Sequence, residues 1–426
     1  MTRMKDSGIE WIGEVPEEWG IKPIKHIFGA IGSGTTPDSS KVEYYDGNIN
    51  WLQSGDLYKK DYVYAVSKTI TDLGYRSSAS LRIYQAPFLA IAMYGASIGN
   101  LAISKIDACV NQAVAVLKGE ENIVRFAKLA LEISKTELIF AAQGGTQPNI
   151  NQVLIKNWVI PFPSEIEIKK IADFLDKKVA QLDKVKSLLE EQIKTLEDYR
   201  QSLIYETVTK GLDKTVPLKD SGVDWIGQIP EGWGVKPIKY CSRFQRGFGF
   251  PVELQGNDDG EIPFYKVSDL RGNSDEISIS KNYVDLQTAK QNAWVIVPSG
   301  AIIAPVIGAA LLNNNRKIST VPFISDNNTL AIIPNNKNKY FYYLFKVIDM
   351  NWFNNSSTIP AVNISKLANQ IVPTPKEEEQ KQIADFLEVQ IIKIDKLIEI
   401  KQKQINNINQ QRQTLIYDVV TGKRRV

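Results

Sequence analysis

Few residues of this chain are of the kinds that act in catalytic sites, and they match the pattern of no common catalytic site. The 426 residues include one histidine, His26, and Tyr240 replaces it in the second copy of an internal repeat. A lone histidine argues against His-based triads, HExxH zinc sites and clusters of cysteine and histidine ligands. We therefore predict a structural role for His26.

Acidic and phosphate-binding motifs are equally scarce. Pro37-Asp38 is separated by some 130 residues from a plausible Glu-x-Lys, Glu167-Ile168-Lys169, which argues against a nuclease centre. There is no GxxxxGK[ST] loop, and "GAIGSG" at residues 29–34 lacks the GxGxxG spacing. The N/D-P-P-Y/F tetrapeptide with which adenine methyltransferases hold a flipped base is also missing. We expect no catalytic, cofactor or metal residue in this chain.

The composition indicates a globular protein of two to four domains. Cys109 and Cys241 form no CxxC motif, so we interpret them as reduced core residues of a cytoplasmic protein. The net charge of +3 is compatible with a polyanionic partner but too mild to predict one. The N-terminus lacks the apolar region of a signal peptide. Residues 293–312 carry no charge, but Pro298 and Pro305 favour two buried strands around a tight turn over a membrane helix.

The elements that could position a binding surface occur twice along the chain. The stretch "DSGIEWIGEVPEEWGIKPIK" at residues 6–25 returns as "DSGVDWIGQIPEGWGVKPIK" at residues 220–239. A second block, "VIPFPSEIEIKKIADFL" at residues 159–175, matches "IVPTPKEEEQKQIADFL" at residues 371–387. The spacing of about half the chain indicates an internal duplication.

Each second block continues into a long amphipathic helix, which we predict over residues 164–211 and 376–426. In the first copy, leucines recur every seven residues, as in the seam of a coiled coil. Gly211 and Gly422 suit the ends of the helices. We expect the two helices to pair antiparallel around an approximate twofold axis. Four basic residues interrupt the apolar stripe, and either fixed register or ragged packing explains them: Lys186, Arg200, Lys401 and Arg412.

Between the repeated blocks lie two globular regions, residues 1–163 and 212–375. Short Val-, Ile- and Tyr-rich runs bounded by Gly, Asn, Asp and Pro predict mixed, mainly β domains. The predicted fold class is therefore α+β, with two similar domains separated by paired helices. Repeated framework and divergent domains suit a protein that presents two different binding surfaces, although drift after duplication also explains the divergence.

Large aromatic residues in the repeated blocks are candidates for docking two copies of one partner, since such side chains are frequent in interfaces. Packing in the core of the chain is the alternative for each of them. The candidates are Trp11, Trp19, Trp225, Trp233, Phe174 and Phe386.

Several motifs resemble those of the specificity subunit of type I restriction-modification systems. They are "DSGIEWIGEVPEEW" and its copy, "SGTTP" with "YYDGNINWLQSGDL", "YGASIGN", "NQAVAVL", "GGTQPNINQ", and the paired "IADFL...SLIYETVTKG" helices. In the second half, Phe248-Gly249-Phe250 stands in the place of Gly34-Thr35-Thr36, and "IIAPVIGAA" replaces "YGASIGN". These departures fall within the globular domains.

The resemblance implies two target recognition domains that each read one part of a split DNA sequence, with the helices as a spacer. It also implies two modification subunits that bind S-adenosylmethionine and methylate adenine, and restriction subunits that use ATP and Mg²⁺. This chain would then be a cytoplasmic, non-catalytic subunit without a cofactor of its own.

Loops rich in basic, amide and hydroxyl side chains are the candidates for DNA contact, because such groups grip phosphates and reach base edges. In the first domain the candidates are Ser33, Thr35, Thr36, Tyr44, Tyr45, Lys59, Lys60, Gln143, Thr146 and Gln147. In the second domain they are Arg243, Gln245, Arg246, Lys266, Arg271, Asn314, Arg316, Lys317, Asn355 and Thr358.

Two other functions remain open at this stage. The chain could be a non-enzymatic scaffold whose coiled coil joins two protein-binding domains. It could also be the recognition subunit of another DNA-modifying system. An independent enzyme is the weakest alternative, because the catalytic motifs are missing.

Overall fold

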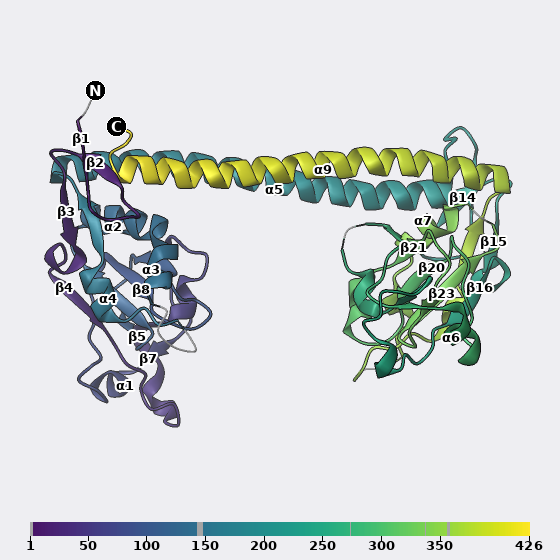
Figure 1. Cartoon of the computed structure of the whole chain (residues 1–426), viewed down its shortest axis with the longest axis horizontal. Helices are drawn as coiled ribbons and strands as arrows, with labels where there is room; N and C mark the ends of the chain where they lie inside the picture. The colour runs from purple at the N-terminus through teal and green to yellow at the C-terminus, as the bar shows by residue number, and fades with distance from the viewer. Residues whose placement is uncertain (1–2, 143–147, 273, 337, 356–357) are drawn as a thin grey trace. The chain divides into compact units, whose positions relative to one another are not determined.

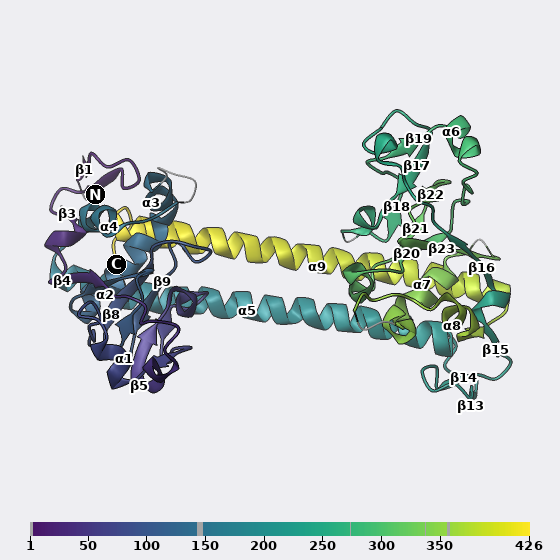
Figure 2. The same ribbon diagram turned by 90° about the horizontal axis from the view of Figure 1, so that it is seen from below.

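The computed structural model of the chain describes residues 3–142, 148–272, 274–336, 338–355 and 358–426 (Figures 1 and 2). The chain forms two compact units. Unit 1 contains Met1–Glu190 and Lys403–Val426, and unit 2 contains Glu191–Gln402. Each unit therefore combines one β domain with parts of two long helices.

The long helices are α5 (Glu165–Lys210) and α9 (Glu377–Val420). Both begin within one residue of the predicted start. Helix α9 ends six residues before the predicted end, because Gly422 adopts a left-handed conformation at φ +76°. Gly211 does the same after α5, at φ +71°.

The two helices run antiparallel where they meet in each unit. In unit 1, Arg412 of α9 lies 3.5 Å from Asp183 of α5, and Arg425, after the end of α9, pairs with Glu167 near the start of α5. In unit 2, Lys401 of α9 donates to Gln192 of α5, and Asp395, earlier in α9, lies 2.7 Å from Arg200, later in α5. Residue numbers rise along one helix as they fall along the other, which confirms the predicted antiparallel pairing.

The β domain of unit 1 is built on a five-stranded sheet in the order β4-β11-β8-β9-β6. A three-stranded sheet, β10-β5-β7, and two strand pairs, β1-β2 and β12-β3, complete it. Its elements are β1 (Met4–Asp6), β2 (Glu14–Pro16), β3 (Gly20–Pro23), η1 (Ile24–His26), β4 (Ala30–Ser33), η2 (Val42–Tyr44), β5 (Tyr45–Leu52), η3 (Ser54–Leu57), β6 (Tyr62–Val63), β7 (Thr69–Ile70), α1 (Asp72–Arg76), β8 (Phe88–Ala92), β9 (Leu101–Ser104), β10 (Cys109–Val110), β11 (Val114–Lys118), α2 (Glu121–Ile133), α3 (Lys135–Ala141), α4 (Gln152–Asn157) and β12 (Val159–Phe162).

The β domain of unit 2 has corresponding sheets in the same order: β16-β23-β20-β21-β18, β22-β17-β19, β13-β14 and β24-β15. Its elements are β13 (Leu218–Asp220), β14 (Gln228–Pro230), β15 (Gly234–Pro237), η4 (Ile238–Tyr240), β16 (Ser242–Arg246), η5 (Val252–Leu254), β17 (Ile262–Tyr265), η6 (Val267–Leu270), β18 (Glu276–Ile277), β19 (Tyr283–Val284), α6 (Leu286–Gln291), β20 (Ile302–Pro305), η7 (Ala309–Asn313), β21 (Lys317–Ser319), β22 (Ile324–Ser325), β23 (Thr329–Pro334), α7 (Tyr340–Val347), η8 (Met350–Phe353), α8 (Ile364–Asn369) and β24 (Ile371–Thr374). The predicted pair of similar, mainly β domains is confirmed.

The central strands are apolar throughout because both faces of each five-stranded sheet are covered. In β8, Leu89 and Ile91 join the cluster formed with α2, whereas Phe88, Ala90 and Ala92 join a second cluster with Leu52. This alternation is the period of two expected of a strand. In unit 2, β20 (Ile302–Pro305) divides its residues between two clusters in the same way.

The twenty-residue repeat joins the β domain to both long helices within each unit. In unit 1, Trp19 Nε1 donates to Glu167 near the start of α5 at 3.4 Å, and Gly422 after α9 lies against the same indole. In unit 2, Trp233 Nε1 donates to Glu379 of α9 at 2.9 Å, and Gly211 after α5 lies beside it. The two copies therefore make the same connection.

This packing corrects part of the predicted docking surface. Trp19 is 2% exposed and Trp233 is 5% exposed. Both indoles are therefore buried in the interior of the chain and offer no surface to a partner. The other four candidates are half-buried and pack against the same two cores: Trp11, Trp225, Phe174 and Phe386.

The uncharged stretch at 293–312 folds inside unit 2. Val297 forms a single bridge with Phe323, the chain turns at Gly300, and β20 follows. The expectation of two strands around a turn is thus correct for the turn and the second strand, while the first is a single bridge. Among the described residues, no helix has the length and apolar character needed to cross a bilayer.

Candidate nucleic-acid interface

In unit 1 the structure gathers two of the predicted groups of residues into one loop cluster. Ser33 accepts a hydrogen bond from Gln152 at 2.7 Å, and Thr36 donates to the Gln112 amide oxygen at 2.6 Å. Tyr45 donates from its hydroxyl to the Pro37 carbonyl at 2.7 Å. Burial, followed by the charge of Asp38, raises the pKa of the Tyr45 phenol, so it stays a donor.

Buried Trp51 supports this loop cluster from beneath. Its indole donates to the Thr35 carbonyl at 3.2 Å, and its ring meets Tyr45 edge to face at 5.8 Å. Tyr44 lies under the ammonium of Lys41, which is 5.1 Å from the ring centre. The cluster therefore presents amide and hydroxyl groups from a fixed base, as a surface that reads base edges requires.

A glycine fixes the start of the same loop in both units. A Cβ atom on Gly34 would lie 1.8 Å from the Val110 carbonyl oxygen, and one on Gly247 would lie 1.8 Å from that of Asp326. Gly247 is therefore the counterpart of Gly34. This corrects the alignment proposed from the sequence by one residue.

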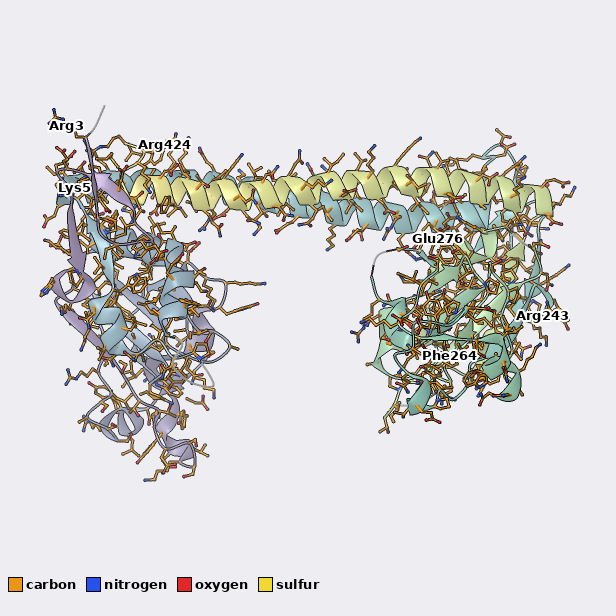
Figure 3. The ribbon with its side chains drawn as sticks, viewed as in Figure 1. Arg3, Lys5, Arg243, Phe264, Glu276 and Arg424 are labelled. Carbon is orange, nitrogen blue, oxygen red and sulfur yellow. The ribbon has the colours of Figure 1, made fainter. Side chains whose placement is uncertain are left out.

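After that glycine the two loops differ in chemistry. Unit 1 continues with Thr35 and Thr36, whereas unit 2 continues with Phe248 and Phe250. Phe250 stacks on Phe264 with ring centres 3.9 Å apart, and Trp294 meets both rings edge to face. Figure 3 shows Phe264 inside the β domain. The loop of unit 2 is thus held by aromatic packing.

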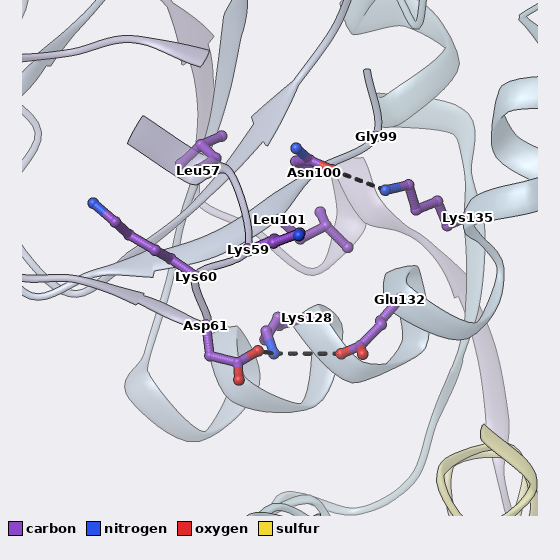
Figure 4. Close-up of a pocket in the computed structure, with 10 residues that line it drawn as sticks. All are labelled: Leu57, Lys59, Lys60, Asp61, Gly99, Asn100, Leu101, Lys128, Glu132 and Lys135. Atoms are coloured by element: carbon purple, nitrogen blue, oxygen red, sulfur yellow. Dashed lines mark hydrogen bonds and ion pairs between the residues drawn. The ribbon is translucent and has the colours of Figure 1, made fainter. Parts of the chain in front are cut away.

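Lys59 and Lys60 lie apart from the loop cluster, in a basic pocket of about 190 Å³ (Figure 4). This pocket is lined by the turn after η3, by Asn100, by Lys128 of α2 and by Lys135 of α3. Lys135 donates to Asn100 at 3.0 Å, and burial lowers its pKa. Lys59 holds a left-handed conformation at φ +53°, where unit 2 has Gly272. A basic pocket of this kind suits a backbone phosphate.

A neighbouring cavity of about 430 Å³ contains residues that the sequence did not nominate. Tyr58, Tyr94 and Ser97 line it, from η3 and from the turn between β8 and β9. Tyr94 and Ser97 belong to the "YGASIGN" motif that carried the family resemblance. The motif was therefore the sequence signal that could have identified Tyr94 and Ser97. Its last residue, Asn100, could have identified the basic pocket in the same way.

In unit 2 the predicted residues spread over several elements. Arg243 (Figure 3) is exposed on the edge strand β16. Arg246 of the same strand is also exposed, and Gln245 is half-buried. Lys266 donates to Gln255 at 2.9 Å, and Arg271 is exposed after η6. Asn355 and Thr358 are exposed in a separate loop. Gln143, Thr146 and Gln147 of the first domain lie outside the described residues.

Two predicted contacts are corrected by burial. Arg316 is 3% exposed and Lys317 is 5% exposed, so neither can reach a phosphate. The Arg316 guanidinium donates to the Ile348 carbonyl at 2.8 Å and to Asn314, which is itself a predicted contact. Sequence alone could not reveal this, since β21 draws these residues into the sheet.

Three ion pairs hold each β domain and its helices together, and each has a counterpart in the other unit. The first is Arg125–Asp176 at 2.6 Å in unit 1 and Lys339–Glu388 at 2.6 Å in unit 2. The second joins the turn after the short 3-10 helix to α2 or α7: Lys128–Asp61 and Lys346–Asp275. The third is the interhelical pair Arg412–Asp183 and Arg200–Asp395.

The basic residues in the helical stripe thus have defined partners. Arg200 and Arg412 pair across the helices, and Lys401 donates to Gln192 of the facing helix at 2.6 Å. Lys186 instead pairs within its own helix, with Glu190. Fixed register explains three of these four residues better than ragged packing does.

The two cysteines, Cys109 and Cys241, lie in the interior. Both are free and buried, and burial raises the pKa of the Cys109 thiol to about 12. Within the described residues, no group of three or more His, Cys, Asp and Glu side chains could hold a metal ion.

Comparison with known proteins gives the same internal duplication. The family profile described as "Type I restriction modification DNA specificity domain" matches residues 16–197 and 230–410. The chain belongs to this family. A relative named type I restriction enzyme MjaIX specificity subunit, from Methanocaldococcus jannaschii, is 26% identical over 97% of this chain and 95% of its own length. The EcoBI specificity subunit of Escherichia coli is 26% identical over 74% of this chain and 69% of its own length.

Solved structures share the fold of this specificity-domain protein. A chain from a study of assembly and conformational transition in the type I restriction-modification system has a TM-score of 0.73, at 14% identity. The match covers 95% of this chain and 98% of that chain. The HsdS subunit of Thermoanaerobacter tengcongensis has a TM-score of 0.53 at 15% identity, with 96% of this chain and 98% of its own covered.

Proposed function

We propose that the chain is the DNA specificity subunit of a type I restriction-modification complex and recognises two unlike half-sites separated by a gap. The observation that carries this proposal is a shared framework with unlike surfaces. Equivalent glycines and ion pairs hold the two β domains. The loops that follow Gly34 and Gly247 are polar in one unit and aromatic in the other.

The complex would take its chemistry from its other subunits. We infer two cytoplasmic modification subunits that carry S-adenosylmethionine, and restriction subunits that use ATP and Mg²⁺. The half-buried aromatic residues Trp11, Trp225, Phe174 and Phe386 are the proposed docking positions. Their occurrence in equivalent places of the two units supports two docking sites of one kind.

Sequencing of DNA methylation in cells that express this chain with its modification subunit tests the function directly. The expected result is adenine methylation within one split motif whose halves differ. Methylation that does not depend on this chain, or a single continuous motif, would contradict the proposal.

The spacer role has its own test. Residues 187–193 of α5 and 402–408 of α9 can be deleted together, which leaves the Arg412–Asp183 and Arg200–Asp395 pairs intact. Seven residues of helix span about 10 Å, or about three base pairs at 3.4 Å each. We expect the gap of the methylated motif to shorten by about that amount while both half-sites stay the same. An unchanged gap would rule out the spacer role.

A salt titration of DNA binding separates this function from that of a protein scaffold. Neutralising phosphates with basic groups makes affinity fall steeply as salt rises. Lys59→Ala with Lys60→Ala should weaken binding and flatten the salt dependence by about two phosphate contacts. Thr136→Ala, at an exposed position on the neighbouring α3, provides a control. DNA binding that salt leaves unchanged would favour the scaffold.

A further inference from the structure

The turn between β10 and β11 in unit 1 corresponds to the turn between β22 and β23 in unit 2. The first residue of each turn donates its N–H to the end of the neighbouring strand: Asn111 to the Leu52 carbonyl at 3.0 Å, and Asp326 to the Tyr265 carbonyl at 2.9 Å. Its own carbonyl accepts from the first residue of the strand that follows, in both units. The second residues of the two turns are therefore equivalent.

These second residues are Gln112 and Asn327, and both side chains are exposed. The residues before them differ, since unit 1 has an asparagine there and unit 2 an aspartate. An exposed amide side chain is thus present at the same turn of two domains whose loops have diverged. Neither amide was among the DNA contacts predicted from the sequence.

Each turn lies against the loop that follows the close-packed glycine. In unit 1, Thr36 donates from its hydroxyl to Gln112 Oε1 at 2.6 Å. In unit 2, the Phe248 N–H donates to the Ser325 carbonyl at 2.8 Å, and Phe248 forms a bridge with Asp326. Turn and loop therefore belong to the same surface in each unit, and Gln112 belongs to the loop cluster.

The hydrogen bond from Thr36 orients the Gln112 amide. Because the hydroxyl uses one lone pair of Oε1, that oxygen keeps one acceptor site and the Nε2 group keeps two donors. The major-groove edge of adenine presents the complementary pair, the N7 acceptor beside the N6 amino donor. Guanine presents two acceptors there, and cytosine and thymine have no N7. Gln112 is therefore best suited to adenine.

Asn327 carries the same amide on a side chain that is one methylene shorter. The adjoining loop residues 248–251 are Phe, Gly, Phe and Pro, so none of their side chains can orient Asn327 as Thr36 orients Gln112. Asparagine pairs with the adenine edge in the same way as glutamine. Ordering a free side chain costs affinity, so the contact of Asn327 should be the weaker of the two.

We propose that Gln112 and Asn327 are base-reading residues, each of which pairs with the major-groove edge of one adenine in its half-site. This assignment rests on the proposed function, because it requires that each β domain reads one half of a split DNA target. The adenine is not the one that becomes methylated, since a base must leave the stack for that reaction. A bidentate contact of this kind discriminates about tenfold against other bases.

Methylation sequencing in cells that express the chain with its modification subunit tests both residues. Gln112→Ala and Asn327→Ala should each relax one adenine position, in opposite halves of the motif. Gln181→Ala on α5 and Gln382→Ala on α9 remove exposed amides elsewhere and should leave the motif unchanged. A native motif in either test variant would overturn the proposal and leave the proposed function standing. Methylation that does not need this chain would contradict that function itself.

Binding by the purified complex with the modification subunit separates base reading from support of the loop. 7-Deazaadenine, which lacks the N7 acceptor, replaces in turn each adenine of the first half-site other than the methylated one. At one position it should weaken native binding about tenfold and leave binding by Gln112→Ala almost unchanged, because the amide donor and N7 act together. Support of the loop alone would not depend on N7. Equal losses for the two complexes at every position would overturn the proposal.

Gln112→Glu sharpens the assignment at that position. A carboxylate accepts from cytosine N4 and cannot donate to N7 of adenine. The variant complex should therefore bind a duplex with cytosine in place of this adenine more tightly than the native duplex. An undiminished preference for adenine would contradict the proposed contact.

Discussion

Units 1 and 2 keep the same internal connections while their loops have diverged. The indoles of Trp19 and Trp233 each bond to an acid near the start of a long helix. Gly34 and Gly247 each approach a carbonyl oxygen too closely for any side chain. In contrast, the residues that follow these glycines share neither polarity nor partners. The attachment of each domain to the helices was therefore preserved after the duplication, while the outer loops changed.

The ion pairs add a second difference between the units. Equivalent pairs occur in both, but in unit 1 Glu132 of α2 pairs with both Lys128 and Arg412 and so joins two of them. The first β domain is therefore linked to its helices by an unbroken series of charges. The second is linked to α9 through Lys339, which pairs with both Glu276 of β18 and Glu388 of α9.

The largest expected effect tests whether the repeated indoles are equivalent. Trp19→Ala and Trp233→Ala should each lower the free energy of unfolding by about 3–5 kcal/mol, because each leaves a cavity between helix ends and the β domain. Urea denaturation of the full chain measures this. Trp352→Ala, at a side chain that is 49% exposed, is the control and should cost much less. A small effect at only one indole would end the equivalence.

The next effect tests the glycines that start the diverged loops. Gly34→Ala and Gly247→Ala should each cost about 1–3 kcal/mol, since the new methyl group overlaps a backbone carbonyl. Gly29→Ala and Gly249→Ala are controls, because a Cβ atom at either place meets nothing within 4 Å. Thermal unfolding compares the four variants. If control and test variants behave alike, the close approach does not constrain the loop.

A smaller effect distinguishes the two interhelical arginines. Arg412→Met should destabilise by about 1–2 kcal/mol, because it leaves the partly buried Glu132 with Lys128 alone. Arg200→Met removes a more exposed pair and should cost less than about 1 kcal/mol. Chemical denaturation of both variants gives the difference. Equal losses would show that the link through Glu132 contributes nothing.

The smallest effect concerns alkaline pH. Burial tends to lower the pKa of Lys128, but Glu132 and Asp61 outweigh it and raise the pKa above 10.5. Its stabilising contribution is therefore present below pH 10.5 and is lost as the pH rises through the higher folded value. Burial lowers the pKa of Lys346 below 10.5, so folding is favoured increasingly as the pH rises toward 10.5.

Urea unfolding over this pH range, compared with Lys128→Met and Lys346→Met, measures the two contributions. The advantage of the native chain over Lys128→Met should shrink above pH 10.5. Its advantage over Lys346→Met should grow as pH 10.5 is approached. Parallel changes for the two variants would contradict the difference between the units.

The sequence predicted the duplication, the two long helices and the mainly β character of both domains. These follow from local patterns, such as leucine every seven residues and glycine after each helix, which act over short stretches of chain. It also nominated the Ser33–Thr36 and Tyr44–Tyr45 groups that the structure brings together. It did not separate Lys59 and Lys60 from them.

Which of the nominated side chains are accessible depends on tertiary packing, which the sequence did not reveal. Trp19 is covered by the residues after α9, some 400 positions away, and Arg316 is drawn into the interior by β21. The equivalent pairs Lys128–Asp61 and Lys346–Asp275 join residues whose surrounding sequences have diverged. Burial and ion pairing depend on which distant segments meet, and no local pattern records that.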